Sequence, residues 1–146
     1  MKTLIRDIAI VLVVVLAITF FIKPIIVKKT SMEPNLTEND YLFISKQAYR
    51  FGEPERGDII VFPHYTGGEK ELYIKRVIGL PGETIETKDG EIYNLEVPED
   101  QVFVMGDNRQ VSLDSRSDML GTISKKSIKG KAVFRFYPFS DAGKIH

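Results

Sequence analysis

The apolar N-terminal segment constrains this chain more than any other feature. Ile8–Ile22 is an unbroken run without a charged side chain, rich in Val, Ile and Leu. Extended to Val27, with Lys23 as its one charge, it reaches the roughly 20 residues that a helix needs to cross a bilayer. A lysine near the end of such a helix can place its ammonium group at the interface. We therefore expect residues 1–27 to form a membrane anchor and residues 28–146 to form a separate domain.

A cleavable signal peptide is the alternative interpretation, because Met1–Asp7 resembles the charged region that precedes the apolar part of such a peptide. The segment after the run, Lys23–Lys28, contains no small-x-small cleavage site, which favours a retained anchor. Basic residues flank both ends of the run, so the positive-inside rule does not orient it.

Charge and composition exclude several functions. The net charge is zero, and residues 1–27 carry a charge of about +2, so the rest carries about −2, which argues against the basic surface that nucleic acids require. The absence of Cys excludes disulfides and thiolate zinc sites. Only His64 and His146 are available for a histidine-based metal site or triad. We expect no nucleic-acid partner, no metal and no cofactor.

The rest of the chain has the pattern of a mainly β, antiparallel domain: short segments of period two, separated by Gly, Pro, Asn and Asp. Pro81-Gly82 and Asp89-Gly90 are expected turns, and Ser124–Ile128 an expected helical turn. The expected strands are Ile25–Thr30, Asp40–Lys46, Asp58–Phe62, Leu72–Leu80, Glu83–Thr87, Glu91–Tyr93, Gln101–Met105 and Lys131–Tyr137. Residues 63–68 are expected to be a surface loop, in which His64 has no assigned role.

Lys75 and Ser31 are the residues whose side chains are best suited to catalysis. On a strand, Lys75 shares a face with Tyr73 and Val77, and an apolar neighbourhood lowers the pKa of an amine. To act as a base, that pKa must fall from about 10.4 to about 8, at a free-energy cost of about 3 kcal/mol. The alternatives are an edge-strand lysine with its amine in water and a serine that merely occupies a turn.

A serine hydroxyl becomes a nucleophile when a base within about 3 Å takes its proton. The spacing of Ser31 and Lys75 does not show that they meet. Ser112 lies in a polar loop, from which its hydroxyl could orient the amine of Lys75 by a hydrogen bond. Acidic and basic residues that could pair lie in or near that loop: Arg76, Asp107, Arg109, Asp114 and Arg116. The alternative interpretation is that they form ordinary surface ion pairs with no part in a site.

Five segments, in this order and together, carry a family resemblance: Ser31-Met32-x-Pro34-x-Leu36, Gly57–Phe62, Tyr73–Gly82, Gly106–Arg109 with Ser112–Arg116, and Gly130–Phe139. They resemble the bacterial type I signal peptidases (leader peptidases), a family of serine proteases with a Ser/Lys dyad. The likeness spans nearly the whole chain. It implies an antiparallel β catalytic domain that follows a single transmembrane helix.

The resemblance also implies roles for individual residues. Ser31 is the expected nucleophile and Lys75 the expected general base, with Ser112 orienting the amine. Asp107 is expected to pair with Arg76, and Asp114 with Arg116. The shallow substrate pockets are expected to be lined by Met32, Leu36, Tyr73 and Ile74.

By the same resemblance, the substrates are signal peptides of exported pre-proteins, bound as an added β-strand and cleaved after a small-x-small motif such as Ala-x-Ala. The expected location is the cell membrane, single-pass, with the N-terminus cytoplasmic and the catalytic domain on the extracytoplasmic face. An apolar surface rests on the phospholipid bilayer in this family; the residues expected to belong to it, or to the core, are Phe134, Phe136, Tyr137 and Phe139.

The sequence departs from the family at two places. Lys29 and Thr30 stand where small or acidic residues are usual, and a side chain there completes the oxyanion hole in some members. Losing one such donor costs about 3 kcal/mol in catalysis. The segment from Ile92 to Pro98 is short, so we expect a trimmed second sub-region around residues 83–100.

Two other functions stay open on the sequence. One is a self-cleaving Ser/Lys protease of the SOS-repressor type, against which the anchor and the lack of a DNA-binding segment argue. The other is a catalytically silent, membrane-anchored relative that serves as a scaffold or assembly factor. The presence of Ser31, Lys75 and Ser112 argues against the silent relative, and Lys29 argues for it.

Overall fold

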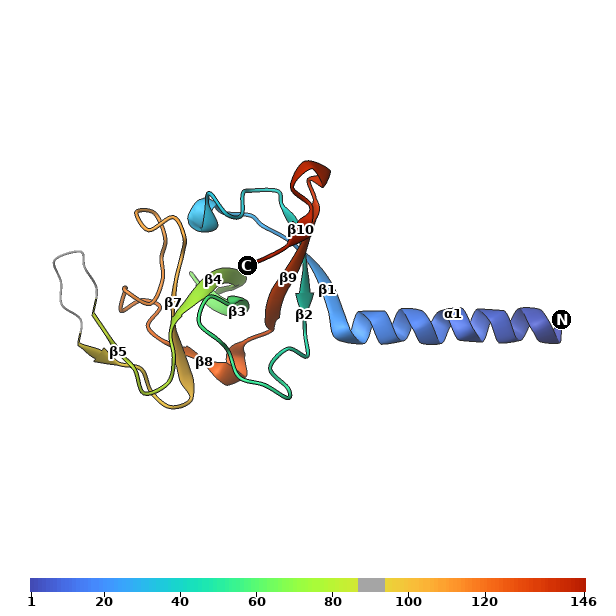
Figure 1. The fold of residues 1–146 in the computed structure, drawn as a ribbon, viewed down its shortest axis with the longest axis horizontal. Coiled ribbons are helices and arrows are strands. Elements are labelled where there is room, and N and C mark those ends of the chain that lie inside the picture. Colours follow the sequence, from blue (N-terminus) through green and yellow to red (C-terminus); the bar gives the residue numbers. More distant parts are fainter. Residues whose placement is uncertain (87–93) are drawn as a thin grey trace.

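The computed structural model describes residues 1–86 and 94–146. A long N-terminal helix projects from a β domain, as Figure 1 shows. The helix and the strands are α1 (Lys2–Phe21), β1 (Ile22–Ile26), β2 (Tyr41–Ser45), β3 (Ile59–Thr66), β4 (Glu69–Gly79), β5 (Thr84–Ile85), β6 (Leu95–Glu96), β7 (Gln101–Met105), β8 (Ile123–Ser124), β9 (Gly130–Tyr137) and β10 (Gly143–Lys144). Three 3-10 turns join them: η1 (Thr30–Met32), η2 (Lys125–Ser127) and η3 (Phe139–Asp141).

Helix α1 is long and apolar enough to span a membrane, and none of its residues is buried. It ends at Phe21 instead of continuing towards Val27, so the expected helical extent was wrong at this end. Pro24 supplies the reason, because a proline disfavours helical backbone in the residue before it. The chain continues as β1, an edge strand, where a proline is tolerated. The first strand therefore begins three residues earlier than predicted, and Val27 is buried in the core.

The end of α1 is joined directly to the β domain. The Lys46 amide donates to the carbonyl of Phe21 at 2.9 Å, and Lys46 Nζ donates to the carbonyl of Thr19 at 3.0 Å. Gln47 Nε2 donates to the carbonyl of Phe20 at 3.4 Å. The last carbonyls of a helix lack partners within the helix, so these bonds fasten α1 to the residues that follow β2.

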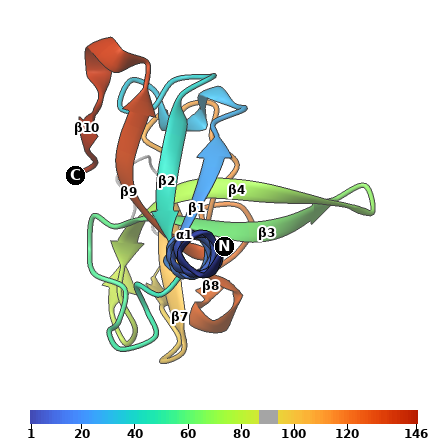
Figure 2. The same cartoon turned by 90° about the vertical axis from the view of Figure 1, so that its right-hand side faces the viewer.

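The main sheet has the strand order β1-β2-β9-β3-β4-β7-β8, with β10 beside β9, and all its pairs are antiparallel. In Figure 2 the β3–β4 hairpin crosses the direction of β1, β2 and β9. A smaller sheet, β5–β6, occupies the region around residues 83–100. The predicted mainly β domain behind an apolar N-terminal helix is confirmed.

Several element boundaries differ from the prediction. The expected loop at 63–68 is mostly strand, because β3 runs to Thr66 and turns at Gly67-Gly68, whose positive φ values of 61° and 88° suit a tight hairpin. The strands β6, β8 and β10 were not predicted, since two-residue strands show no period. The turn at Pro81-Gly82 and the helical turn near Ser124–Ile128 are confirmed. The predicted strand at 91–93 and the turn at 89–90 lie outside the described residues.

Strand β3 is buried on both faces. Ile59 and Val61 belong to a cluster with Met32 and Leu36. Ile60 and Phe62 belong to a second cluster on the other side, with Tyr73 and Val77 of β4. The two clusters hold β4 and the segment that carries Ser31 in fixed places around one sheet.

Candidate active site

Ser31 lies in the turn η1, which is anchored on both sides. The side chains of Met32 and Leu36, 1% and 2% exposed, fix the turn in the core, and the Leu36 amide donates to the Met32 carbonyl at 2.9 Å. On the other side, the Asn108 amide donates to the Ser31 carbonyl at 3.0 Å. The serine is thus set between the core and the loop that follows β7.

Lys75 lies on β4, and its side chain reaches the serine. Lys75 Nζ donates to Ser31 Oγ at 2.7 Å, although 44 positions separate the two residues. The same nitrogen lies 5.3 Å from the centre of the Tyr73 ring, on the face of β4 that the alternation of a strand predicts. The structure therefore brings together the two groups that the sequence singled out.

The Lys75 amine is held in a dry environment. Only 3% of the residue is exposed. Burial lowers the pKa of Lys75 to about 8; the carboxylate of Asp114 opposes this shift, and the charge of Lys29 adds to it. An amine with such a pKa is partly uncharged near neutral pH and can accept a proton.

We expect Lys75→Met to stabilise the protein at pH 7. Below pH 8 the lysine is protonated in both the folded and the unfolded state, so the folded state bears the full cost of a buried charge, about 3 kcal/mol. The lost bond to Ser31 offsets about 1 kcal/mol of the gain. As pH rises from 8 through the unfolded-state pKa near 10.4, the folded wild type loses its proton first, and the advantage of methionine disappears.

Thermal unfolding in detergent, followed by circular dichroism at pH 7 and pH 10, measures this difference. The exposed Lys70, on the same strand, supplies the control variant Lys70→Met, which is expected to unfold like the wild type at both pH values. A Lys75→Met variant that is less stable than the wild type at pH 7 contradicts a buried, costly ammonium group.

Ser112 lies beside this pair but does not bond to it. Its Oγ is buried, and no group among the described residues meets it at good hydrogen-bond geometry, although it lies close enough to Asp114 to help lower the pKa of that carboxyl. The expected bond from Ser112 to Lys75 is therefore not formed. Ser112 and the Ser31 carbonyl both crowd Gly106: a Cβ placed there would lie 2.2 Å from Ser112 Oγ and 2.4 Å from the carbonyl oxygen of Ser31.

Two ion pairs brace the surrounding loops. Arg76 binds Asp107 through two parallel bonds of 2.8 and 2.7 Å, the geometry that makes such pairs strong. Arg116 Nε donates to Asp114 Oδ1 at 2.9 Å. Burial raises the pKa of both carboxyls, but the hydrogen bonds that they accept outweigh it, and both pKa values lie below the usual range. Both carboxylates are thus charged at the pH where the amine of Lys75 titrates.

The four residues expected to line substrate pockets are buried to different depths. Met32 and Leu36 are fully buried, Tyr73 is 8% exposed, and Ile74 is half-buried against the same cluster as Met32. Met32 and Leu36 are thus the deepest of the four, and Ile74 is the most exposed.

Sequence reasoning missed three contributors. Asn108 holds the Ser31 turn through its backbone amide. It belongs to the Gly106–Arg109 segment, in which the sequence assigned a role only to Asp107. Asn35 Nδ2 donates to Asp107 at 2.8 Å. Lys29 reaches Glu71 across 42 positions, a contact that no local pattern reveals.

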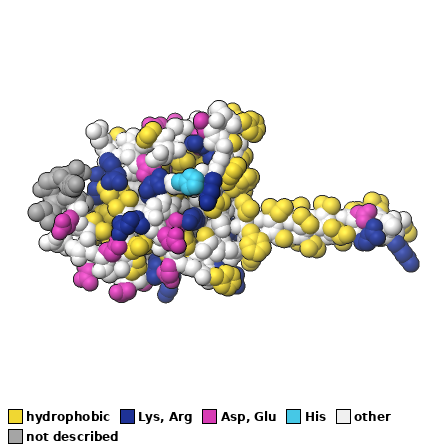
Figure 3. All heavy atoms as spheres, viewed as in Figure 1, with side chains coloured by type: hydrophobic (Ala, Val, Ile, Leu, Met, Phe, Trp, Pro, Cys, Tyr) yellow, Lys and Arg dark blue, Asp and Glu magenta, His cyan; other side chains and the backbone are white. Residues whose placement is uncertain are grey.

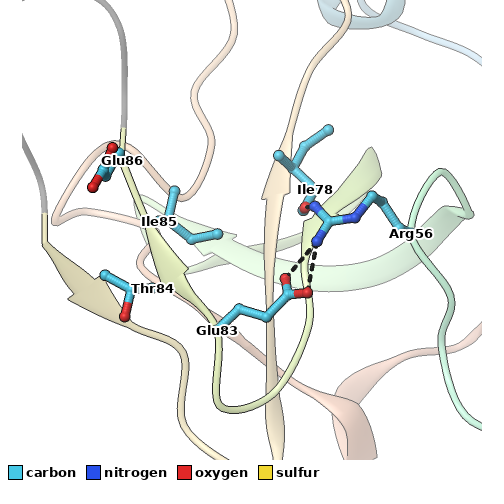
Figure 4. A pocket seen from close by; sticks show the side chains of 6 residues that line it. All are labelled: Arg56, Ile78, Glu83, Thr84, Ile85 and Glu86. Atoms are coloured by element: carbon cyan, nitrogen blue, oxygen red, sulfur yellow. Dashed lines mark hydrogen bonds and ion pairs between the residues drawn. The ribbon is translucent and has the colours of Figure 1, made fainter.

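A separate surface pocket lies next to β5 (Figure 4), lined by Arg56, Ile78, Glu83, Thr84, Ile85 and Glu86. Arg56 Nη2 binds both carboxylate oxygens of Glu83, at 2.6 and 2.7 Å. None of the predicted site residues lines this pocket, and two of its three charged side chains, Arg56 and Glu83, pair with each other. Within residues 1–86 and 94–146, no three His, Asp or Glu side chains gather in a way that would hold a metal ion.

Comparison with known proteins decides the family. The chain matches the family described as signal peptidase, peptidase S26, over residues 1–95 and 94–137. It belongs to the signal peptidase family. A signal peptidase I of Bacillus licheniformis is 38% identical over 170 residues, covering 93% of this chain and 89% of that protein. The signal peptidase I S of Bacillus subtilis is 35% identical, covering 94% and 91%.

A crystal structure of a signal peptidase I from Enterococcus faecalis aligns with a TM-score of 0.43 and 31% identity, covering 55% of this chain and 97% of that one. The predicted membership of the signal peptidase family, and the predicted class of enzyme, a type I signal peptidase, are confirmed by the sequence matches. The roles of single residues in the site remain predictions.

Proposed function

We propose that this chain is a membrane-anchored serine endopeptidase that removes signal peptides from exported pre-proteins, with Ser31 as nucleophile and Lys75 as general base. The contact of 2.7 Å between Lys75 Nζ and Ser31 Oγ, formed by a buried amine whose pKa is lowered to about 8, carries the chemical part of the proposal. Membership of the signal peptidase family supports the substrate class.

The proposed reaction has two halves. In the first, neutral Lys75 takes the proton from Ser31 Oγ as this oxygen bonds to the scissile carbonyl carbon; the resulting ammonium group then protonates the departing amine, which leaves an ester on Ser31. In the second, neutral Lys75 takes a proton from water, which attacks the ester carbonyl, and the Ser31 oxygen recovers the proton as it leaves. Each half returns Lys75 to its uncharged form.

Ser112 fits the orienting role in this reaction. Its buried hydroxyl lies near the Asp114 carboxylate without a hydrogen bond of good geometry, and Lys75 becomes a cation during the reaction. We propose that Ser112 Oγ turns towards this ammonium group once it forms. The Arg76–Asp107 and Arg116–Asp114 pairs keep the supporting loops in place while the charge moves.

The edge of β4 offers a place for a substrate strand. Strand β7 pairs with β4 only from Arg76 to Gly79, so within the described residues the preceding part of this edge has no partner strand. A peptide added there gains backbone hydrogen bonds. Its scissile bond would lie beside Ser31, with Tyr73 and Ile74 beneath its side chains, which suits the small residues of an Ala-x-Ala-like motif.

The proposed membrane location rests on α1 and on the surface next to it. Figure 3 shows apolar side chains along the helix and on the adjoining end of the β domain. On β9 and η3, Phe134, Tyr137 and Phe139 are 41%, 46% and 81% exposed, whereas Phe136 is half-buried and stacks on Phe43 at 4.2 Å. Exposed aromatic residues of this kind favour the interface of a bilayer. We propose a single-pass arrangement with the N-terminus cytoplasmic and the β domain on the extracytoplasmic face.

The experiment that tests this function uses the detergent-solubilised full chain and a purified pre-protein with an Ala-x-Ala motif. The expected result is one cut, directly after the motif, located by sequencing the N-terminus of the product. A matched pre-protein with leucine in place of both alanines should stay intact. Cleavage of neither protein favours a catalytically silent scaffold, and cleavage of the chain itself without the pre-protein favours the self-cleaving alternative.

Activity is expected to rise from pH 7 to pH 9 with a midpoint near the pKa of Lys75, about 8. The base is the uncharged amine, whose population grows from about a tenth at pH 7 to about nine tenths at pH 9. The measurement is kcat/KM for a peptide substrate at several pH values, with the integrity of the fold checked at each. A flat profile, with chemistry as the slow step, contradicts a lysine base.

A further inference from the structure

Lys29 places a second positive charge beside the Ser31–Lys75 pair. Its Nζ lies 2.6 Å from Glu71 Oε2 and 4.9 Å from the centre of the Tyr73 ring. Lys75 Nζ lies 5.3 Å from the same ring centre, so the two nitrogens are within about 10 Å of each other. At such a distance, beside a buried group, like charges still repel each other measurably.

The backbone explains how Lys29 comes to this position. It lies two residues before Ser31, in extended backbone with φ −135° and ψ 159°. Glu71, Tyr73 and Lys75 alternate along β4 and so share one face. The side chain of Lys29 leaves the segment of the nucleophile and lies across this face, where the ring of Tyr73 and the carboxylate of Glu71 hold it.

Few other charges act on this group of residues. Asp114, from the loop after β7, faces Lys75 and opposes the effect of Lys29 on it. Glu71 is faced by Lys29, and also by His64 of β3 and by Lys28. The ring of His64 lies 4.8 Å from that of Tyr73. Among the described residues, Lys29 is therefore the positive charge that acts on the Lys75 amine, and Asp114 is the negative one.

Resting on the function proposed above, we propose that Lys29 is a positioning residue whose charge favours the uncharged amine of Lys75 and selects against substrates with a basic side chain beside the scissile bond. The same charge has both effects, because a cation repels a proton arriving on Lys75 and a cationic substrate residue alike. Peptides with an acidic residue directly after the scissile bond are the expected preferred substrates.

The experiment compares the full-length wild type with Lys29→Met, which removes the charge, and Lys29→Arg, which keeps it. Lys126→Met, an exposed lysine of η2, is the control. Two peptides that differ only in Glu or Lys after the scissile bond are cleaved across a range of pH. For Lys29→Met we expect kcat/KM at pH 7 to be about three-fold lower and the midpoint of its pH profile to lie at higher pH. The ratio of kcat/KM for the Glu peptide to kcat/KM for the Lys peptide should be close to one. Lys29→Arg and Lys126→Met should keep all three properties of the wild type.

A second measurement needs no substrate. NMR titration of protein labelled with 13C in its lysines, with the Lys75 signal assigned from Lys75→Met, reports directly where that amine loses its proton. We expect the signal to titrate at higher pH in Lys29→Met and at the wild-type pH in Lys29→Arg. An unchanged titration overturns the inference about Lys29, even if cleavage requires Ser31. An absence of cleavage by the wild type would instead overturn the proposed function.

Discussion

Replacing Ser31 with alanine is expected to lower kcat for pre-protein cleavage by at least about 10⁴-fold, and Lys75→Ala by a similar factor. In the proposed reaction, Ser31→Ala removes the atom that would form the ester, and Lys75→Ala removes the amine, 2.7 Å away, that would take its proton. Because the two side chains act as a unit, their effects should not add. The double variant is expected to be as slow as the slower single variant, a result that two independent contributions would not give.

The measurement is single-turnover cleavage of the pre-protein, with circular dichroism to show that each variant is folded. Ser140→Ala, an exposed serine of η3, serves as the control and should cleave normally. Equal processing by the wild type, Ser31→Ala and Lys75→Ala would remove the catalytic assignment of both residues.

The second large effect is expected from Gly106→Ala. The added Cβ would lie 2.4 Å from the Ser31 carbonyl oxygen, a backbone atom that cannot rotate away, and 2.2 Å from Ser112 Oγ. The turn that carries Ser31 must therefore move, and a displacement of about 1 Å at a reacting atom costs on the order of 10²-fold in rate. We expect kcat to fall by about that factor.

Gly52→Ala is a matched control for this variant. A Cβ on Gly52 meets its nearest atom at 3.6 Å, an ordinary contact. Steady-state cleavage and thermal unfolding of both variants give the comparison. A Gly106→Ala protein with wild-type kcat would show that the contact between Gly106 and the Ser31 turn has no part in placing the nucleophile.

The sequence predicts well those parts of the fold that a local pattern determines. The apolar run and the long alternating strands, such as β4 and β9, were found within a few residues. The errors arose where one residue or a distant contact decides: Pro24 ends α1 early, and Gly67-Gly68 lets β3 continue through an expected loop. Two-residue strands form only because a neighbouring strand is already in place.

In the candidate site, too, local patterns predict some features and distant contacts decide the others. The face of β4 that carries Lys75 follows from strand alternation, but its contact with Ser31 depends on the packing of Met32 and Leu36. No residue pattern on its own predicts this contact, and the family resemblance was needed to expect it. The Lys29–Glu71 pair joins residues 42 positions apart and lies outside the segments that carry the resemblance, so neither argument found it.

The junction of α1 and β1 has a consequence for the choice of substrate. The strand begins at the residue after the helix ends, and Lys46 and Gln47 bind the last helical carbonyls, so no hinge separates the two elements. In the membrane-spanning arrangement proposed above, Ser31 is held at a set height over the lipid. The enzyme would then select substrates by a length: the number of residues between the end of the substrate's apolar segment and the bond that is cut. This selection would not depend on which side chains flank that bond.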